Sequence, residues 1–104
     1  MTLEDLRELA LRLADASEAP HHHLTSFRSN GKIFATAMRD GEFTNVFVDE
    51  QTREQALALY PDWCDKVLWG GRVVGVRVLL ASADAHFVQQ LLENAWSLRQ
   101  PRAK

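Results

Sequence analysis

Three consecutive histidines, His21, His22 and His23, are the residues of this chain best suited to binding a metal. In an extended segment His21 and His23 would point the same way, and imidazole is a common metal ligand. A metal site needs a third and often a fourth ligand, and neither Cys64 nor His86 stands at a recognised spacing from the histidines. The sequence therefore predicts an exposed loop at the histidines and no metal site.

The single cysteine, Cys64, is the other candidate for reactive chemistry, and it stands between Asp62 and Asp65. Nearby acids disfavour the thiolate, so we expect a buried structural cysteine rather than a nucleophile. Gly70-Gly71 lacks the following Lys-Ser/Thr and helix of a phosphate-binding loop. A chain of 104 residues is also small for a deep cofactor cleft, which usually lies between larger layers. We predict no enzyme activity and no cofactor.

Basic side chains are concentrated in the segments predicted as strands. Residues 24–39 and residues 66–80 each hold three bases and no acid, whereas the helical segments are mostly acidic and the net charge is −2. If the strands share one surface, these bases could attract phosphate groups. The alternative is that they are solvated charges that discourage pairing at sheet edges. The predicted nucleic-acid-binding residues are the six bases and a neighbouring tryptophan: Arg28, Lys32, Arg39, Lys66, Trp69, Arg72 and Arg77.

Four phenylalanines, Phe27, Phe34, Phe43 and Phe47, also lie in the predicted strands. On an open sheet face they could stack against bases. Aromatic residues in sheets more often belong to the core, which is the reading we favour. Trp69 lies outside any clearly periodic segment and could be exposed.

Capping and turn signals predict the elements that must position these residues. Thr2 and Asp5 form a capping box at the start of an amphipathic helix that ends before Pro20. Two turn signals, Asn30-Gly31 and Asp40-Gly41, then predict a three-stranded meander. If both turns are two-residue turns, Phe27 pairs with Phe34 and Phe34 pairs with Phe47.

The second half of the chain predicts two helices around a hairpin. Asp49 caps a helix over residues 50–60, which Pro61 stops, and a last helix begins at Ser82 or Asp84. Between them, residues 66–69 and 72–80 flank Gly70-Gly71 as a second hairpin. Gly75 inside its second strand predicts a bulge or a close backbone approach.

These elements predict one α+β domain over residues 1–104, in the order α-β-β-β-α-β(β)-α. An antiparallel sheet with the helices packed on one face is the economical arrangement. No apolar run approaches the roughly 20 residues that cross a bilayer. The acidic start lacks the features of a signal peptide, and one cysteine fits a reducing compartment. We expect a soluble cytoplasmic protein with no membrane association.

The order of motifs resembles the MmcQ/YjbR-like family over nearly the whole chain. The resemblance is carried by Ser26-Phe27-Arg28 with Asn30-Gly31-Lys32-Ile33-Phe34-Ala35, by Arg72-Val73-Val74-Gly75-Val76-Arg77-Val78, and by Asn94-Ala95-Trp96-Ser97-Leu98. It implies a fold related to the frataxin-like (CyaY-like) architecture and a DNA-binding role through a double-wing motif. Lys32 matches the family's recurrent lysine after the first hairpin turn, and Trp69-Gly70-Gly71-Arg72 matches the second wing more loosely.

The frataxin-like shape also suggests an acidic ridge on the first helix, made of Glu4, Asp5, Glu8, Asp15 and Glu18. Arg7 and Arg12 interrupt this ridge, so we expect a solvated helix face.

The sequence thus predicts a small non-enzymatic binding module that binds DNA weakly through basic hairpin wings. The alternative is a protein–protein interaction domain that uses the acidic helices or an exposed sheet surface. An exposed aromatic patch far from the basic residues would favour that alternative.

Overall fold

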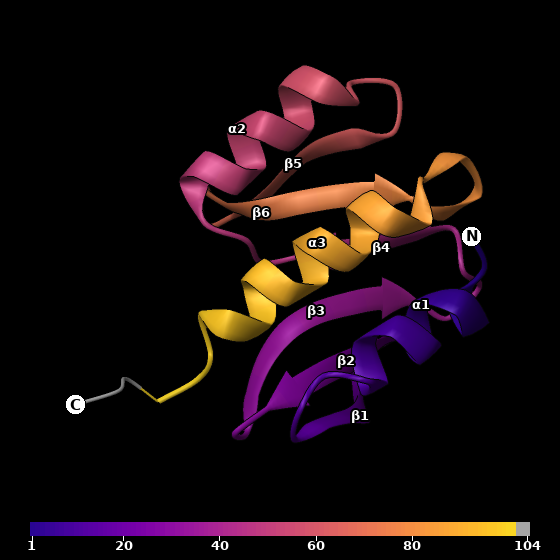
Figure 1. The fold of residues 1–104 in the computed structure, drawn as a ribbon, viewed down its shortest axis with the longest axis vertical. Coiled ribbons are helices and arrows are strands. Elements are labelled where there is room, and N and C mark those ends of the chain that lie inside the picture. The colour runs from indigo at the N-terminus through magenta and orange to yellow at the C-terminus, as the bar shows by residue number, and fades with distance from the viewer. Residues whose placement is uncertain (102–104) are drawn as a thin grey trace.

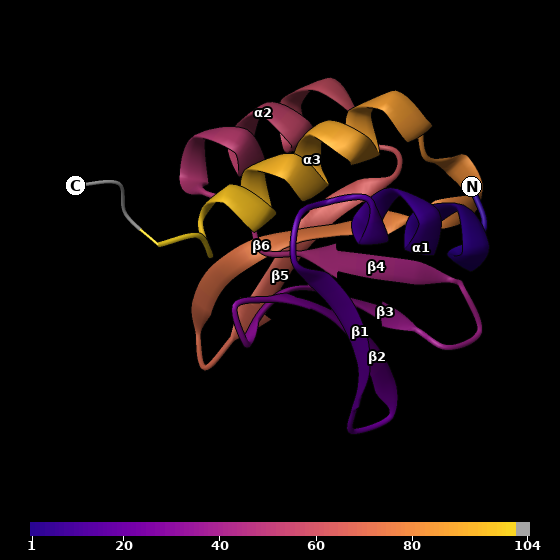
Figure 2. The ribbon, with the colours of Figure 1, turned by 60° about the horizontal axis from the view of Figure 1, so that its bottom comes forward.

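Six strands form one antiparallel sheet in the order β1-β2-β3-β4-β6-β5 in the computed structural model, which describes residues 1–101. The three helices lie together on one face of this sheet (Figures 1 and 2). The predicted α+β class is confirmed. The elements are α1 (Leu3–Leu11), β1 (Ala16–His21), β2 (Leu24–Ser29), β3 (Lys32–Met38), β4 (Phe43–Val46), α2 (Glu50–Leu59), β5 (Cys64–Trp69), β6 (Arg72–Leu79) and α3 (Ala85–Ser97).

The strand β1 is an addition to the predicted order, which therefore becomes α-β-β-β-β-α-β-β-α. The sequence predicts the end of the first helix here, with Glu18 on it, and then the histidine loop from Pro20 onward. Ala16–His21 contains no β-branched residue and no aromatic residue apart from a histidine, so nothing in it indicates a strand. Pairing with β2 nevertheless makes this segment the edge of the sheet. An edge strand tolerates proline, since it can leave the missing N–H on its unpaired side.

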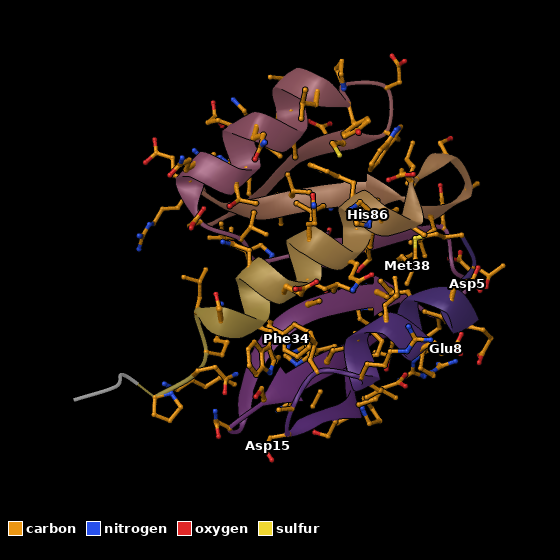
Figure 3. The ribbon with its side chains drawn as sticks, in the orientation of Figure 1. Asp5, Glu8, Asp15, Phe34, Met38 and His86 are labelled. Atoms are coloured by element: carbon orange, nitrogen blue, oxygen red, sulfur yellow. The ribbon has the colours of Figure 1, made fainter. Side chains whose placement is uncertain are left out.

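The predicted pairing of Phe27 with Phe34 is wrong by one residue. Phe27 lies opposite Ala35, while Arg28 lies opposite Ile33, so β3 carries an extra residue at Phe34. This β-bulge keeps Phe27, Phe34 and Ala35 all fully buried in the main core. Phe34 lies between β3 and α3 (Figure 3).

The structure confirms the predicted helix caps and the predicted close approach of backbone at Gly75. Thr2 and Asp5 form the capping box of α1, and Asp49 and Asp84 cap α2 and α3. A Cβ atom at Gly75 would lie only 2.3 Å from the carbonyl oxygen of Val46, so β4 and β6 can pair here only because this residue has no side chain. Within residues 1–101, no helix combines the length and the apolarity that a membrane span requires.

Candidate functional site

The hairpin turns β2–β3 and β5–β6 lie at the same end of the sheet. Both β3 and β6 pair antiparallel with β4, so they run in the same direction and begin at the same end (Figure 2). Each turn has positive φ at both central residues: Asn30 and Gly31 at 54° and 74°, Gly70 and Gly71 at 56° and 80°. Positive φ at both positions is the requirement of the type I′ turn that suits twisted strands. We call this end of the sheet, with its two turns, the hairpin end.

The residues that follow α3 bind the β2–β3 turn. The side-chain amide of Gln100 donates to Ser29 Oγ at 3.0 Å, and the amide of Asn30 donates to the Arg99 carbonyl at 3.3 Å. Arg99 Nε donates to the Ile33 carbonyl at 2.8 Å. These contacts bring a basic residue, Arg99, to the hairpin end. Sequence reasoning missed it, because no local pattern links residue 99 with a turn at residue 30.

The sheet face opposite the helices, which we call the open face, carries a row of polar residues. Ser26, Thr36, Asn45 and Arg77 lie side by side across β2, β3, β4 and β6. The first three are buried, and Asn45 Nδ2 donates to Thr36 Oγ1 at 3.3 Å. This face is therefore neither a second apolar core nor a fully hydrated surface.

Two arginines of the open face are held by this polar row. Arg28 Nε donates to Ser26 Oγ at 3.0 Å, and Arg77 Nε donates to Asn45 Oδ1 at 3.2 Å. The Arg77 guanidinium also lies 4.3 Å from the centre of the Phe43 ring, in cation–π range. In both arginines the terminal nitrogens find no hydrogen-bond partner within residues 1–101. Each guanidinium is thus oriented and has donors left for an anion.

A groove of about 300 Å³ lies on the open face toward the hairpin end. At its base Phe47 is buried, and the ring of Trp69 packs against it with the two ring centres 5.0 Å apart and the planes tilted by 56°. Trp69 itself remains 51% exposed. The lining residues are His21, Ile33, Phe47, Trp69, Val74 and Arg99. Phe47 and Trp69 therefore form an aromatic surface outside the main core.

The structure brings five of the seven predicted binding residues to the open face or the hairpin end. Arg28, Trp69 and Arg77 lie on the open face, and Lys32 and Arg72 begin the strands at the hairpin end. Two others lie elsewhere: Arg39 is in the β3–β4 turn at the opposite end of the sheet, where it donates to the His22 carbonyl. Lys66 on the edge strand β5 pairs with the core residue Val76 and so points toward the helix side. The predicted surface is therefore smaller than the sequence suggested.

None of the six predicted bases forms an ion pair with a carboxylate of residues 1–101. All the ion pairs found there belong to Arg7 of α1, Arg12 at the C-cap of α1 and Arg53 of α2. The acids Asp5 and Glu8 also lie on α1, away from the hairpin end (Figure 3). Asp15 is an exception, since it precedes Ala16, which pairs with Ser29 beside the β2–β3 turn. The positive charge of the hairpin end is thus largely unneutralised.

The remaining reactive residues do not form a catalytic arrangement. Cys64 is buried, and burial raises the pKa of its thiol to about 11. The cause is burial and not the neighbouring carboxylates that the sequence suggested. His21 lines the groove, and its ring packs edge-on against His22 at 4.6 Å. In the part of the chain that the structure describes, no group of three His, Cys, Asp or Glu side chains is placed to hold a metal ion.

The acidic ridge suggested by the frataxin-like shape is interrupted by its arginines, and two of its five acids, Asp15 and Glu18, do not belong to the helix. Glu18 lies on β1, where it accepts hydrogen bonds from Arg7 Nε at 2.6 Å and from Thr25 Oγ1 at 2.7 Å. Arg7 also pairs with Glu4. These bonds tie α1 to the edge of the sheet, which gives Glu18 a structural role.

The comparison with solved structures supports the fold. The chain is similar to the crystal structure of the Deinococcus radiodurans protein DR2400, a domain of the DUF419 family, with a TM-score of 0.78 and 20% sequence identity. The match covers 93% of this chain and 77% of the other. No protein-family model and no curated protein matches the sequence. At this identity the likeness establishes a common fold and nothing more.

Proposed function

We propose that this domain is a non-enzymatic module that binds nucleic acid weakly at the hairpin end and the open face. The proposal rests on one observation: the bases that form ion pairs and the bases that form none lie in different parts of the molecule. All ion pairs of residues 1–101 use arginines of α1, its C-cap or α2, whereas Arg28, Lys32 and Arg72 have no carboxylate partner there. An unneutralised basic surface on a protein of net charge −2 is the electrostatic footprint of a phosphate-binding face.

The family resemblance of the sequence supports the same proposal. The MmcQ/YjbR-like family is described as DNA-binding through two hairpin wings, and DUF419 is related to that family. In this chain the two corresponding turns lie at one end of the sheet, with Lys32 after the first and Arg72 after the second. Two projecting turns with basic residues at their bases could straddle a phosphate backbone.

Few phosphate contacts are available, so the binding should be weak and dependent on salt. Arg28, Lys32, Arg72 and Arg99 are the bases closest to the hairpin end, and each neutralised phosphate contributes to affinity mainly through counterion release. Such contacts position the ligand but do not read its sequence. We therefore propose a binding mode without strong base specificity.

A titration of labelled DNA at two salt concentrations tests this proposal. Lys32→Ala and Arg72→Ala should each weaken binding at low salt by roughly threefold to tenfold, and equally for unrelated sequences. Arg12→Ala is the matched control, because it removes the same charge from an exposed position at the C-terminal end of α1. The proposal is wrong if no complex forms even at low salt, or if the control loses as much affinity as the two variants.

The alternative, a protein-interaction domain, would be favoured by exposed aromatic residues far from the bases. The most exposed tryptophan is Trp69, and it lies directly across from Arg72 in the β5–β6 hairpin. Aromatic and basic residues that lie together are typical of nucleic-acid surfaces. This neighbourhood is why we place nucleic-acid binding first.

A further inference from the structure

We propose that the groove on the open face holds an unpaired base, so that the preferred ligand is single-stranded nucleic acid. This inference rests on the proposed function and adds the class of ligand to it. It starts from the aromatic pair Phe47 and Trp69, which lies outside the main core and beside the basic hairpin end.

Part of the Trp69 ring is not covered by other residues of the protein. The Phe47 ring packs against it with the two ring centres 5.0 Å apart, yet about half of the Trp69 side chain, 51%, is exposed. An exposed tryptophan held by a buried aromatic neighbour is rigid and apolar, and every base has a flat face that can stack on it. In a duplex the flat faces are covered by neighbouring base pairs, so only an unpaired or extruded base can use this ring.

The charges around the groove fit a base that remains attached to its phosphates. Arg99 belongs to the lining, and Arg72 lies across from Trp69 in the same hairpin. No carboxylate is among the lining residues. A stacked base would therefore have donors for its flanking phosphates beside the ring, and grooves for single strands combine stacking and basic residues in this way.

The dimensions of the groove favour one base over an enclosed small molecule. Its volume of about 300 Å³ stands at the lower limit of small-molecule sites. The groove is partly open to solvent, and its polar side chains, His21 and Arg99, lie among apolar ones. A single base whose strand continues outside the groove suits this shape better than a ligand that must be surrounded.

Three labelled ligands of equal length test the inference at low salt: a thymine single strand, a duplex, and a strand that contains abasic sites in place of the bases. The wild type should bind the thymine strand best. Loss of the bases should reduce affinity roughly fivefold to a hundredfold, the range for stacking on one aromatic residue. Trp69→Ala should bind the thymine strand and the abasic strand equally, with unchanged affinity for the abasic strand.

Two further variants separate stacking from folding. Leu68→Ala is the matched control, since Leu68 is the adjacent residue and is 61% exposed, and it should keep the preference for the thymine strand. Trp69→Phe should keep part of it, and a thermal melt of each variant reports the fold. Equal wild-type affinity for all three ligands would overturn the inference and leave the proposed function standing. Absence of binding to all three would overturn both.

Discussion

At the scale of single residues, the side chains of the open face are oriented by hydrogen bonds within the sheet. Arg28 and Arg77 each use Nε to reach a buried polar partner, Ser26 and Asn45. A lysine could donate one bond to the same partner, but it has no planar fork that would fix the direction of its remaining donors. Hydrogen bonds to the buried polar row therefore fix the orientation of these arginines, as packing fixes the orientation of core side chains.

The ion pair between Arg7 and Glu18 predicts a pH dependence of stability. The hydrogen bond from Arg7 is the main cause that lowers the pKa of Glu18. A lowered pKa stabilises the fold above the unfolded value of about 4.3, and this contribution is lost as the pH falls through the folded pKa. We expect Glu18→Gln to flatten the dependence of the unfolding free energy between about pH 5 and pH 3, by about 1 kcal/mol or less.

Chemical denaturation at several pH values measures this effect. Arg7→Gln should flatten the same region, because it removes the other partner of the bond. If the curves of wild type and Glu18→Gln run parallel from pH 5 to pH 3, the pair has no role in acid stability.

At the scale of the elements, the strand pair β4–β6 depends on a residue without a side chain. In Gly75→Ala the new Cβ would lie 2.3 Å from the Val46 carbonyl oxygen and 3.0 Å from Phe47 Cα, both of them backbone atoms that cannot rotate away. We expect the free energy of unfolding to fall by about 2–4 kcal/mol, as in other overpacked sites. Thermal or urea denaturation measures it.

Gly71→Ala is the control for this prediction. Gly71 has a φ of 80°, but a Cβ there would meet no atom within 4 Å. Only the backbone conformation is then penalised, by about 1 kcal/mol. Equal losses for the two variants would show that the contact with Val46 is not the cause.

Local signals in the sequence predict most of the elements. They do not predict the strand register or the contacts between segments that are far apart in the chain. Asn30-Gly31 and Gly75 specify conformations that few other residues allow, so their meaning is local and the structure confirms it. The strand β1 has no such signal, because pairing with β2 imposes its conformation. The bulge at Phe34 shifts the register. It places both Phe34 and Ala35 in the core, and burying both side chains stabilises the fold more than a regular alternation of faces along β3 would.

The candidate site is less predictable than the fold for the same reason. Lys32 and Arg72 could be assigned from turns that are readable in the sequence. Arg99 and Phe47 enter the groove only through contacts between segments far apart in the chain. For Lys66 and Arg39 the only signal is charge, and charge determines neither the face of the sheet, as for Lys66, nor its end, as for Arg39.

At the scale of the whole molecule, the strands carry five bases and only two acids, so the net charge of −2 does not describe the sheet. Asp15 is the acid closest in sequence to the edge that pairs beside the β2–β3 turn. We expect Asp15→Asn to strengthen DNA binding about twofold at low salt, because it removes one nearby repulsive charge. Asparagine also tolerates the φ of 59° found at this position.

Glu8→Gln changes the net charge by the same amount on α1 and should leave the affinity unchanged (Figure 3). A DNA titration of both variants at low salt compares the two sites. Equal strengthening in both would mean that only total charge matters and that the hairpin end has no special place in binding.

The bonds from Arg99 and Gln100 to the β2–β3 turn have a thermodynamic consequence for any ligand. If the turn were flexible, ordering it on ligand binding would cost about 1–2 kcal/mol of backbone entropy per residue. This cost would weaken the binding of the ligand. Here the residues that follow the last helix already hold the turn in the folded protein. Lys32 is consequently presented from a rigid support, and only its own side-chain rotamers remain to be ordered upon contact.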